Sequence, residues 1–483
     1  MTTAAPGVTK EVFLTALDCR TAGWFVRQQP VAGAPTPGDL LRMEEGKEVG
    51  RRARNVFPDG TFVRAQDGAA ETKRLMANPK VQTLFEATFH IDGYTARADI
   101  LRRHGKGWHL IEVKSDTSDK PELLDDLTYT AMVMQRCGVR VTKVSLWLIS
   151  KGYRLGMADA KLFVEEDHTD DVEDRLGDFL AVWGDVATKT TQPTRPAPAL
   201  MLACRSCPYF EDECLGKGVE DHIFDLPRLS ATKFGGLNAL GVTCIANIPE
   251  DFDLTENQER VRACVISGKP SVDALLADDL EAVVWPAHYL DFETVMTAIP
   301  LYPDLVPYTQ VPTQFSVHIC SAPGKVVAHN EFLAPDPTND CRRELAESLL
   351  DALRGEGSIV TYSGFEKRVI GELADALPDL APQLKKLRGR LVDLHAILTK
   401  RVYHPGFHGS GSIKATLPVL VPDMSYEGLE IGDGDAAVAA FVKMARGLCS
   451  AGETKRIRAA LLTYCGQDTM AMVRVHERLL RFT

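Results

Sequence analysis

The sequence has no run that approaches the roughly 18 consecutive apolar residues of a membrane-spanning helix. Its first residues, MTTAAPGVTKEVFLTALDCR, contain no basic segment followed by a long apolar one, so the pattern of a secretion signal is missing. There is also no internal repeat and no long low-complexity segment. These absences argue against a membrane protein and against an exported one, and we expect a cytoplasmic protein.

A disulfide framework and an excess of positive charge are also missing. Eleven cysteines are an odd number in a long chain without an export signal, so metal or cluster ligation explains them better than disulfides. The net charge is −11, which argues against a surface coated with DNA-binding charge, because phosphate neutralisation requires Lys and Arg. A nuclease is not excluded, since acidic metal ligands add to the total and a cleft can be basic within an acidic protein.

The composition that remains is that of an ordinary globular protein of two or three cores, with 45% hydrophobic and 25% charged residues in 483. Short strand-like runs and a helical period alternate between residues 81 and 149. A Thr/Pro-rich surface connection follows at 188–199, and the strand pattern restarts near residue 285. We therefore predict an α/β multidomain protein, with domains at 1–225 and 284–483 joined by a helical, helix–hairpin–helix-like bridge at 226–283.

Asp99, Glu112 and Lys114 form the first candidate site. Asp99 lies in the run YTARADILRR, and Glu112 and Lys114 lie two residues apart in WHLIEVKS, so the acid and the amine project from one face of a strand. Two carboxylates can hold a hard divalent cation, while the ammonium can orient or deprotonate a water and offset charge on a phosphate. The alternative is an ordinary solvent-facing Glu–Lys pair. The intervening turn HGKG, and Ile111 and Val113 on the opposite face, favour the site.

The hairpin ARADILRRHGKGWHLIEVKS resembles the active-site hairpin of RecB-like nucleases of the PD-(D/E)xK superfamily, and MEEGKEVGRRARNVFPDG resembles the helix that precedes it. The resemblance implies a restriction-endonuclease-like core that binds Mg²⁺ or Mn²⁺. It makes Asp99 and Glu112 metal ligands and Lys114 the catalytic lysine, with Glu86 as a candidate further acid. The sequence departs from the family on the following helix, where Tyr129 is followed by a threonine instead of standing beside a glutamine.

The segment CRSCPYFEDEC supplies Cys204, Cys207 and Cys214 within eleven residues, the first two at CxxC spacing. In RecB-like nucleases with an iron–sulfur clasp, a lone N-terminal cysteine joins such a trio, and Cys19 in TALDCRTAGWF resembles it. The resemblance implies a [4Fe–4S] cluster that ties together the ends of the first domain, although thiolates also suit tetrahedral zinc. The alternative is a set of unrelated reduced thiols.

Further candidate acids lie beyond residue 285. The motif HYLDFET presents Asp291 and Glu293 on one face at the end of an apolar strand. Glu366 lies in SIVTYSGFEKRVI, where a strand turns into a helix, and Tyr464 and Asp468 lie four residues apart in the helix LLTYCGQDTMAMVRV. Four acids from separate elements can bind two divalent ions roughly 4 Å apart, and the tyrosine can align an attacking water. Taken singly, each acid is more simply a surface group or a helix cap.

In this order the acids resemble the DnaQ-like DEDD exonucleases, in the version whose third motif is Tyr-x-x-x-Asp. The resemblance implies an RNase H-like fold, a two-metal site and a product with a 5′-phosphate. The stretch from about 285 to 480 also resembles an uncharacterised bacterial domain family often fused behind a RecB-like nuclease, on the motifs LDFET, IPLYPDLVPYTQVPTQFSVHI, RLVDLHAIL, GSGSIKATLPVL and YCGQDTMAMV. The second DEDD motif is altered, because Ser363 and Glu366 stand where Asn and Asp are usual. Asp393 and Lys414 can either contact substrate phosphate or fix a loop.

The leading hypothesis is a metal-dependent deoxyribonuclease, in particular an exonuclease, that acts in DNA repair, recombination or defence against foreign DNA. Its expected partner is DNA, with single-stranded DNA as one candidate, and not a membrane. The alternative is a DNA-binding or scaffold protein in which one nuclease domain is inactive. A phosphatase-like hydrolase ranks last, because the sequence has no Gly-rich phosphate loop followed by Lys and Ser or Thr.

Overall fold

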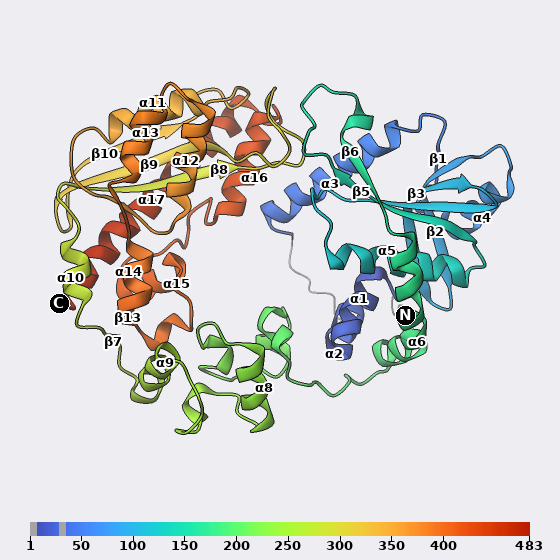
Figure 1. Cartoon of the computed structure of the whole chain (residues 1–483), viewed down its shortest axis with the longest axis horizontal. Helices are drawn as coiled ribbons and strands as arrows, with labels where there is room; N and C mark the ends of the chain where they lie inside the picture. Colours follow the sequence, from blue (N-terminus) through green and yellow to red (C-terminus); the bar gives the residue numbers. More distant parts are fainter. Residues whose placement is uncertain (1–6, 29–34) are drawn as a thin grey trace. The chain divides into compact units, whose positions relative to one another are not determined.

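The computed structural model describes residues 7–28 and 35–483 (Figure 1). The chain divides into two compact units, each assembled from separate stretches. The first unit comprises Met1–Met201, Ser206–Leu215 and Thr297–Thr309. The second unit comprises Leu202–Arg205, Gly216–Met296 and Gln310–Thr483. Each unit is built around a mixed β-sheet with helices, so the protein belongs to the α/β class, as its sequence pattern predicts.

The sheet of the first unit has six strands in sequential order. Strands β2, β3 and β4 form an antiparallel meander, β5 lies parallel to β4, and the edge strands β1 and β6 pair with β2 and β5. Helix α5 (Pro121–Arg136) supplies the crossover that the parallel pair requires. The strands are β1 (Thr61–Phe62), β2 (Thr83–Ile91), β3 (Tyr94–His104), β4 (Gly107–Val113), β5 (Val141–Ile149) and β6 (Phe163–Asp167).

Helices cover both faces of this sheet. Helices α1 (Lys10–Asp18), α5 and α6 (Thr169–Thr191) pack on one face, and α3 (Pro37–Asn55) packs on the other. Because side chains alternate along a strand, neighbouring residues serve the two faces. Leu110 of β4 packs with the first group of helices, whereas Ile111 packs with α3.

Buried tyrosines attach the helices to the sheet. Tyr94 of β3 stacks on Trp183 of α6, with ring centroids 3.5 Å apart, and its hydroxyl donates to the Trp183 carbonyl at 2.6 Å. The Tyr129 hydroxyl of α5 is near two acceptors, the carbonyls of Val8 at 2.8 Å and Thr95 at 2.9 Å. A buried hydroxyl without a partner is costly, so these bonds fix the helices in one position on the sheet.

The first two helices form a close pair. Gly23 of α2 (Arg20–Gln28) lies against Ala16 of α1, and an added Cβ at Gly23 would stand 2.5 Å from the Cβ of Ala16. Glycine is therefore required for this approach. Trp24 of α2 donates to the carbonyl of Gln192 at 2.8 Å, which joins the pair to the end of α6. Cys19 lies between the two helices.

The stretch Thr297–Thr309 belongs to the first unit although it follows β8 of the second. Its residues Ala298 and Ile299 are buried in a cluster with side chains from α3 and β5. The Tyr308 hydroxyl donates to the carbonyl of Ser115, the residue after Lys114. The core of the first unit is therefore completed by residues that come late in the chain.

The sheet of the second unit has five strands in the order β10–β9–β8–β11–β12. Strands β8, β9 and β10 are antiparallel neighbours, and β11 and β12 are parallel to β8. Strand β8 is thus central, with partners on both sides. The strands are β8 (Ala287–Val295), β9 (Val311–Ala322), β10 (Lys325–Leu333), β11 (Ile359–Thr361) and β12 (Leu391–Asp393).

Alternation along β8 separates its core residues from its acids. Leu290 and Phe292 pack in a core with α11 (Arg342–Ala352), α12 (Phe365–Ala376) and α13 (Ala381–Arg388). Tyr289, Asp291 and Glu293 alternate with them and belong to the other side, where the 30-residue helix α17 runs along β8 and β9 (Figure 1). The Tyr289 hydroxyl lies 2.7 Å from Nδ1 of His476 in this helix, α17 (Ala451–Leu480). The acids of β8 therefore face α17.

The remaining elements are short. Those of the first unit and its border are α4 (Gly68–Ala77), α7 (Phe210–Glu213), η1 (Asp159–Lys161) and η2 (Leu202–Ser206). Those of the second unit are η3 (Ile223–Asp225), α8 (Ala231–Ala239), η4 (Ile245–Asn247), α9 (Glu256–Ser267), β7 (Ser271–Val272), α10 (Leu276–Glu281), α14 (Leu394–Arg401), β13 (Val402–Tyr403), η5 (Pro405–Phe407), α15 (Ile413–Leu420) and α16 (Gly434–Ala445). Within the described residues, no helix combines the length and apolar character needed to cross a membrane.

Ile299→Ala tests whether the late stretch supports the core of the first unit. Removing a buried large side chain costs roughly 2–5 kcal/mol, so we expect faster amide hydrogen exchange in α3 and β5 and unchanged exchange in β8 and β9. Met296→Ala is the matched control, because the Met296 side chain is 48% exposed. Equal exchange in the two variants would contradict the assignment of this stretch to the first unit.

Candidate metal centres

The first candidate centre lies on the β3–β4 hairpin. Ile100 pairs with Ile111, so Asp99 and Glu112 are the next residues along the two strands. The Asp99 carboxylate accepts a hydrogen bond from the backbone N–H of Val113 at 2.8 Å. Glu112 is only 3% exposed, and its Oε2 atom is buried without a hydrogen-bond partner in the described part of the chain. Such an atom is costly to leave unpaired, and a hard cation would satisfy it.

Two lysines contact the carboxylate of Glu112. Lys10, the first residue of α1, lies 2.5 Å from Glu112 Oε1, and Lys114 lies 3.3 Å from the same atom. Asp126 of α5 accepts a hydrogen bond from Lys114 and lies 3.7 Å from Lys10. The structure thus brings together the predicted residues Asp99, Glu112 and Lys114, and adds two that sequence reasoning missed. Lys10 is 102 residues from Glu112, and Asp126 has no distinctive spacing, so neither gave a signal.

The charged groups at this centre shift one another's pKa values. Burial and the charge of Glu112 raise the pKa of Asp99 to about 7, although a backbone N–H and Lys10 oppose the shift. Burial acts to raise the pKa of Glu112 as well, but Lys10 and Lys114 outweigh it and the pKa is lowered. Burial alone would lower the pKa of Lys114, but Glu112 and Asp126 raise it above its usual value. The raised pKa favours the charged form of Lys114 at neutral pH.

Two other residues suggested by the family resemblance are held by different partners. Glu86 lies opposite Asp99 in the β2–β3 ladder, but its carboxylate lies 2.9 Å from Arg97 and 3.5 Å from Arg54. Its charge still contributes to the raised pKa of Asp99. Tyr129 is a core residue, and its hydroxyl is directed to backbone carbonyls. Glu86 is thus beside the centre, and Tyr129 is not part of it.

Three of the four predicted cluster cysteines lie together. Cys19 follows α1, and Cys207 and Cys214 lie in the stretch Ser206–Leu215 of the same unit. Burial raises the pKa of the Cys207 thiol, and the nearby thiols of Cys19 and Cys214 raise it further. Cys204 is buried in η2, three residues before Cys207. Crowded thiols are the donor set of a soft metal ion or an iron–sulfur cluster.

The second candidate centre lies at the acidic side of β8. Strand β11 is parallel to β8, so the chain that leaves its carboxyl end enters α12 close to the acids of β8. Asp291, Glu293 and Cys465 each offer a ligand atom, and these atoms lie within 4.8 Å of one another. The charges of three neighbouring acids act on Asp291, namely those of Asp468, Glu293 and Glu366. The structure therefore brings together all four acids that the sequence pattern selected.

Crowding and burial oppose ionisation at this centre. Burial, then the charges of Asp468 and Glu293, raise the pKa of Asp291 well above its usual value. Burial and Asp468 raise the pKa of Glu293 to about 8. Burial also raises the pKa of Glu366 to about 7 and that of Asp468 to about 6. A bound cation would relieve this repulsion, and the donor set of carboxylate oxygens fits Mg²⁺ or Mn²⁺.

Lys414 and two tyrosines line the same centre. The Lys414 ammonium lies 5.4 Å from the ring centroids of both Tyr426 and Tyr464, and its charge lowers the pKa values of Glu293 and Asp468. The Tyr426 hydroxyl donates to Asp468 at 2.5 Å. Burial and the charge of Asp468 raise the pKa of Tyr464, so its hydroxyl keeps its proton. Sequence reasoning left the role of Lys414 open and missed Tyr426, which lies alone in a loop.

The altered second motif still delivers a carboxylate to the centre. The Ser363 hydroxyl lies 3.5 Å from Glu366 Oε2 and also accepts the backbone N–H of Phe365 at 3.0 Å. Asp393 ends β12 and caps α14 by accepting the N–H of Ala396 at 2.9 Å. Its charge adds to the causes that raise the pKa of Glu366. Asp393 therefore fixes a helix and also lies near the acids.

Comparison with known proteins shows that part of this unit is similar to a described domain family. Residues 288–412 match a domain of unknown function, DUF2779. The matched stretch includes Asp291, Glu293, Glu366 and Asp393. A curated protein of Mycoplasma pneumoniae, described as "Uncharacterized protein MG366 homolog", is 26% identical over 208 residues. The match covers 39% of this chain and 31% of that relative, so the chain spans about a third of its length.

The crowded acids predict how stability depends on pH when EDTA removes divalent ions. In the folded state the pKa values of Asp468, Glu366 and Glu293 are about 6, 7 and 8, whereas their unfolded values are near 4. The folded state therefore binds more protons than the unfolded state between about pH 4 and pH 8. Their contribution to stability is fully present below about pH 4 and is lost as the pH rises through about 8. We expect a lower urea midpoint at about pH 8.5 than at about pH 5.

Asp291→Asn with Glu293→Gln should reduce this difference in midpoint, because the substitutions remove two of the interacting carboxyl groups. Glu356→Gln with Asp375→Asn is the matched control, since both of these acids are exposed and should leave the difference unchanged. An identical pH dependence in the two double variants would show that the β8 acids are not its source.

Proposed function

We propose that the chain is a metal-dependent nuclease that hydrolyses phosphodiester bonds in DNA, with a PD-(D/E)xK-type centre in the first unit and a DEDD-type centre in the second. The observation that carries the proposal is that each unit gathers buried carboxylates from separate elements beside a lysine. Buried like charges are costly unless a cation joins them. Acidic metal ligands next to a protein cation suit a substrate whose reacting group is an anionic phosphate.

The sheet topologies support the two assignments. A PD-(D/E)xK core is expected to have an antiparallel meander followed by a crossover helix and a parallel strand, and β2, β3, β4, α5 and β5 have this order. An RNase H-like unit is expected to carry its first acids on a central strand of a mixed sheet. Strand β8 has this position, with antiparallel β9 on one side and parallel β11 on the other.

In the first centre, divalent ions held by the carboxylates would polarise the phosphate and lower the pKa of a bound water. The protein's own contribution begins with Lys114, whose raised pKa keeps it charged and suited to stabilise negative charge on the phosphate. Asp126 accepts a hydrogen bond from the Lys114 ammonium and so orients it. Lys10, from helix α1, forms a second ion pair with Glu112. Lys10 and Asp126 are thus positioning residues.

In the second centre, Tyr464 and Lys414 have the corresponding tasks. The protonated hydroxyl of Tyr464 can hold a water in line with the phosphorus atom, because its pKa is raised by burial and by Asp468. The Lys414 ammonium, which faces both tyrosine rings, offsets the charge of the acids and of an incoming phosphate. Tyr426 orients Asp468 through its hydrogen bond. The resemblance to DEDD exonucleases implies that the products are nucleotides with a 5′-phosphate.

We also propose that Cys19, Cys204, Cys207 and Cys214 hold a [4Fe–4S] cluster. The crowding of Cys19 and Cys214 around Cys207 supports this proposal. Four thiolates suit iron–sulfur ligation. A bound cluster would be a structural link and would take no part in the hydrolysis. It would join the α1–α2 pair to the segment that follows α6.

A cleavage assay on end-labelled single-stranded and duplex DNA with Mg²⁺ or Mn²⁺ tests the nuclease. We expect Lys114→Ala to lower cleavage by the first centre at least roughly a hundredfold, because it removes a cation aimed at developing charge. Asp291→Asn with Glu293→Gln should do the same for the second centre, and the three changes together should abolish cleavage. Lys106→Ala, in the exposed β3–β4 turn, is the matched control for the lysine change.

The variants that lose cleavage show which of the two centres is the nuclease. If Lys114→Ala alone abolishes cleavage, the first centre is the nuclease, and if only the Asp291/Glu293 variant does, the roles reverse. Inactivity of the wild-type chain on both substrates with both metals would overturn the proposal and favour a DNA-binding scaffold.

Metal analysis of the purified chain tests the cluster. Cys207→Ser should lower the bound iron and the visible absorbance of the protein, because it removes a thiolate from the crowded group. Cys137→Ser is the matched control, since Cys137 lies on α5's C-terminal end and its thiol donates to the carbonyl of His90. Zinc in place of iron would correct the identity of the metal, and a wild-type chain with neither would refute the site.

A further inference from the structure

Two aspartates and a histidine of the second unit lie together outside the two candidate centres. Asp225 is the last residue of η3, Asp221 lies just before that turn, and His408 follows η5. Each of the three side chains offers one possible ligand atom, and these atoms lie within 4.8 Å of one another. The group therefore joins two segments of the second unit that are far apart in the sequence.

The geometry of the group suits a shared cation better than a hydrogen bond. Nδ1 of His408 lies 3.7 Å from a carboxylate oxygen of Asp221 and also 3.7 Å from one of Asp225. Both separations exceed the roughly 2.7–3.2 Å of an N–H···O bond, and one ring N–H can point at only one acceptor. Two ligand atoms about 2.1 Å from a tetrahedral ion lie about 3.4 Å apart, so small side-chain movements would complete the coordination.

The two carboxylates also need a positive partner. Both are partly buried, and Asp221 forms no ion pair with a lysine or arginine among the described residues. The charges of both aspartates reach the neighbouring phenol, because burial raises the pKa of Tyr403 to about 12 and Asp225 and Asp221 add to the shift. Like charges this close repel each other, and a divalent cation would offset both.

The backbone places the ligands before any ion binds. Asp221 has a φ of +48° and His408 a φ of +44°, a region in which residues other than glycine are uncommon and often mark functional sites. The carbonyl of Asp221 accepts the N–H of Ile245 at 2.9 Å. An added Cβ at Gly409 would stand 2.3 Å from the carbonyl oxygen of Asp225, so the two segments are in close contact.

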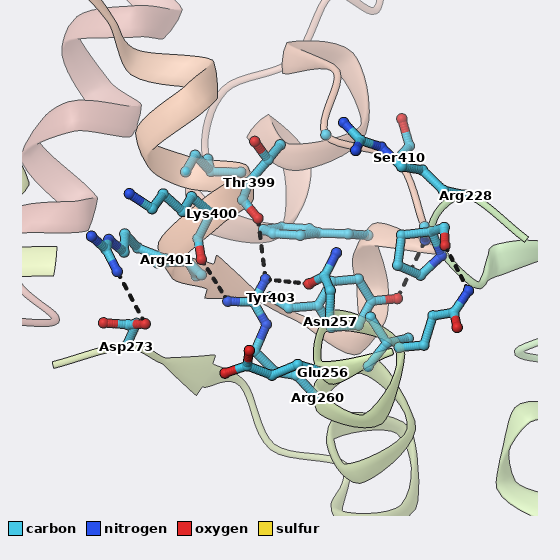
Figure 2. Close-up of a pocket in the computed structure, with 18 of the residues that line it drawn as sticks. Arg228, Glu256, Asn257, Arg260, Asp273, Thr399, Lys400, Arg401, Tyr403 and Ser410 are labelled. Carbon is cyan, nitrogen blue, oxygen red and sulfur yellow. Dashed lines mark hydrogen bonds and ion pairs between the residues drawn. The ribbon is translucent and has the colours of Figure 1, made fainter. Parts of the chain in front are cut away.

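The group borders a pocket of about 930 Å³. Figure 2 shows Arg228 and Ser410 in the lining of this pocket, and they lie three and two residues after Asp225 and His408. The His408 side chain is 62% exposed. Water therefore has access to coordination positions that the three side chains do not fill.

We propose that Asp221, Asp225 and His408 bind a Zn²⁺ ion. Two carboxylate oxygens and one imidazole nitrogen suit this borderline cation, whereas Mg²⁺ prefers oxygen ligands alone. The ion is distinct from the cations of the two proposed nuclease centres, and the inference does not depend on nuclease activity. It links the segment before α8 to the loop that leads into α15, the helix that carries Lys414.

Hydrogen exchange of the full chain, measured by mass spectrometry in EDTA, Zn²⁺ or Mg²⁺, tests this site. We expect Zn²⁺ to slow amide exchange in the peptides that contain Asp221 and Asp225 and, at the same Zn²⁺ concentration, in those that contain His408. Mg²⁺ should not produce this paired protection, because it does not favour the imidazole nitrogen.

His408→Asn and Asp221→Asn remove one ligand each. Asparagine tolerates the left-handed conformation of both positions, so the backbone is retained. The Zn²⁺ concentration at half protection should rise at least roughly tenfold in each variant, since loss of a residue that only orients a ligand already costs about that much. His104→Asn, which changes an exposed histidine at the end of β3, is the matched control and should leave the titration unchanged.

The two substitutions lie in different segments, so exchange in the segment opposite each substitution separates loss of the ion from local disturbance. Wild-type exchange that Zn²⁺ leaves unchanged in both segments would overturn the proposal. Wild-type protection that persists with an unchanged midpoint in both asparagine variants would overturn it too. Equal protection by Mg²⁺ and Zn²⁺ would also count against it, because oxygen ligands would then suffice without His408.

Discussion

A carboxylate taken out of water needs a positive partner, and both units are arranged around this requirement. In the first centre the protein supplies the partners itself, because Lys10 and Lys114 both contact Glu112 and lower its pKa. In the second centre Lys414 lowers the pKa values of Glu293 and Asp468, but these pKa values stay raised, to about 8 in the case of Glu293. Side chains of the protein thus offset more of the buried negative charge in the first centre than in the second.

This difference follows from where each acid lies in the fold. Glu112 is on an inner strand, and α1 crosses the sheet close enough for Lys10 to reach it. Cys19 caps the end of the same helix, so a single short element joins the cysteine group to the first centre. The acids of β8 instead face α17, which supplies a third carboxylate, a thiol and a tyrosine.

The residues that sequence reasoning found are those with a local pattern. Glu112 and Lys114, or Asp291 and Glu293, are two apart on apolar strands, and this spacing places each pair on one face. Lys10 was not predictable, because its contact with Glu112 depends on how a helix crosses the sheet. The packing of Thr297–Thr309 in the first unit was also missed, because the hydrophobic periodicity of a sequence does not indicate which core a loop packs against. The strand order and the acids of each centre can be predicted from periodicity and motifs. The residues that contact those acids are determined by tertiary packing, which the sequence pattern does not reveal.

The position of Thr297–Thr309 has a consequence for the order of events during synthesis. Domains of a growing chain generally fold as units from the N-terminus onward. The core around Ile299 in the first unit cannot close until this stretch has left the ribosome, when β8 has already emerged. At that moment β9, β10, β11 and β12 have not yet emerged from the ribosome, so β8 has no partner strand. The strand that carries the acids of the second centre is therefore exposed while the first unit completes itself.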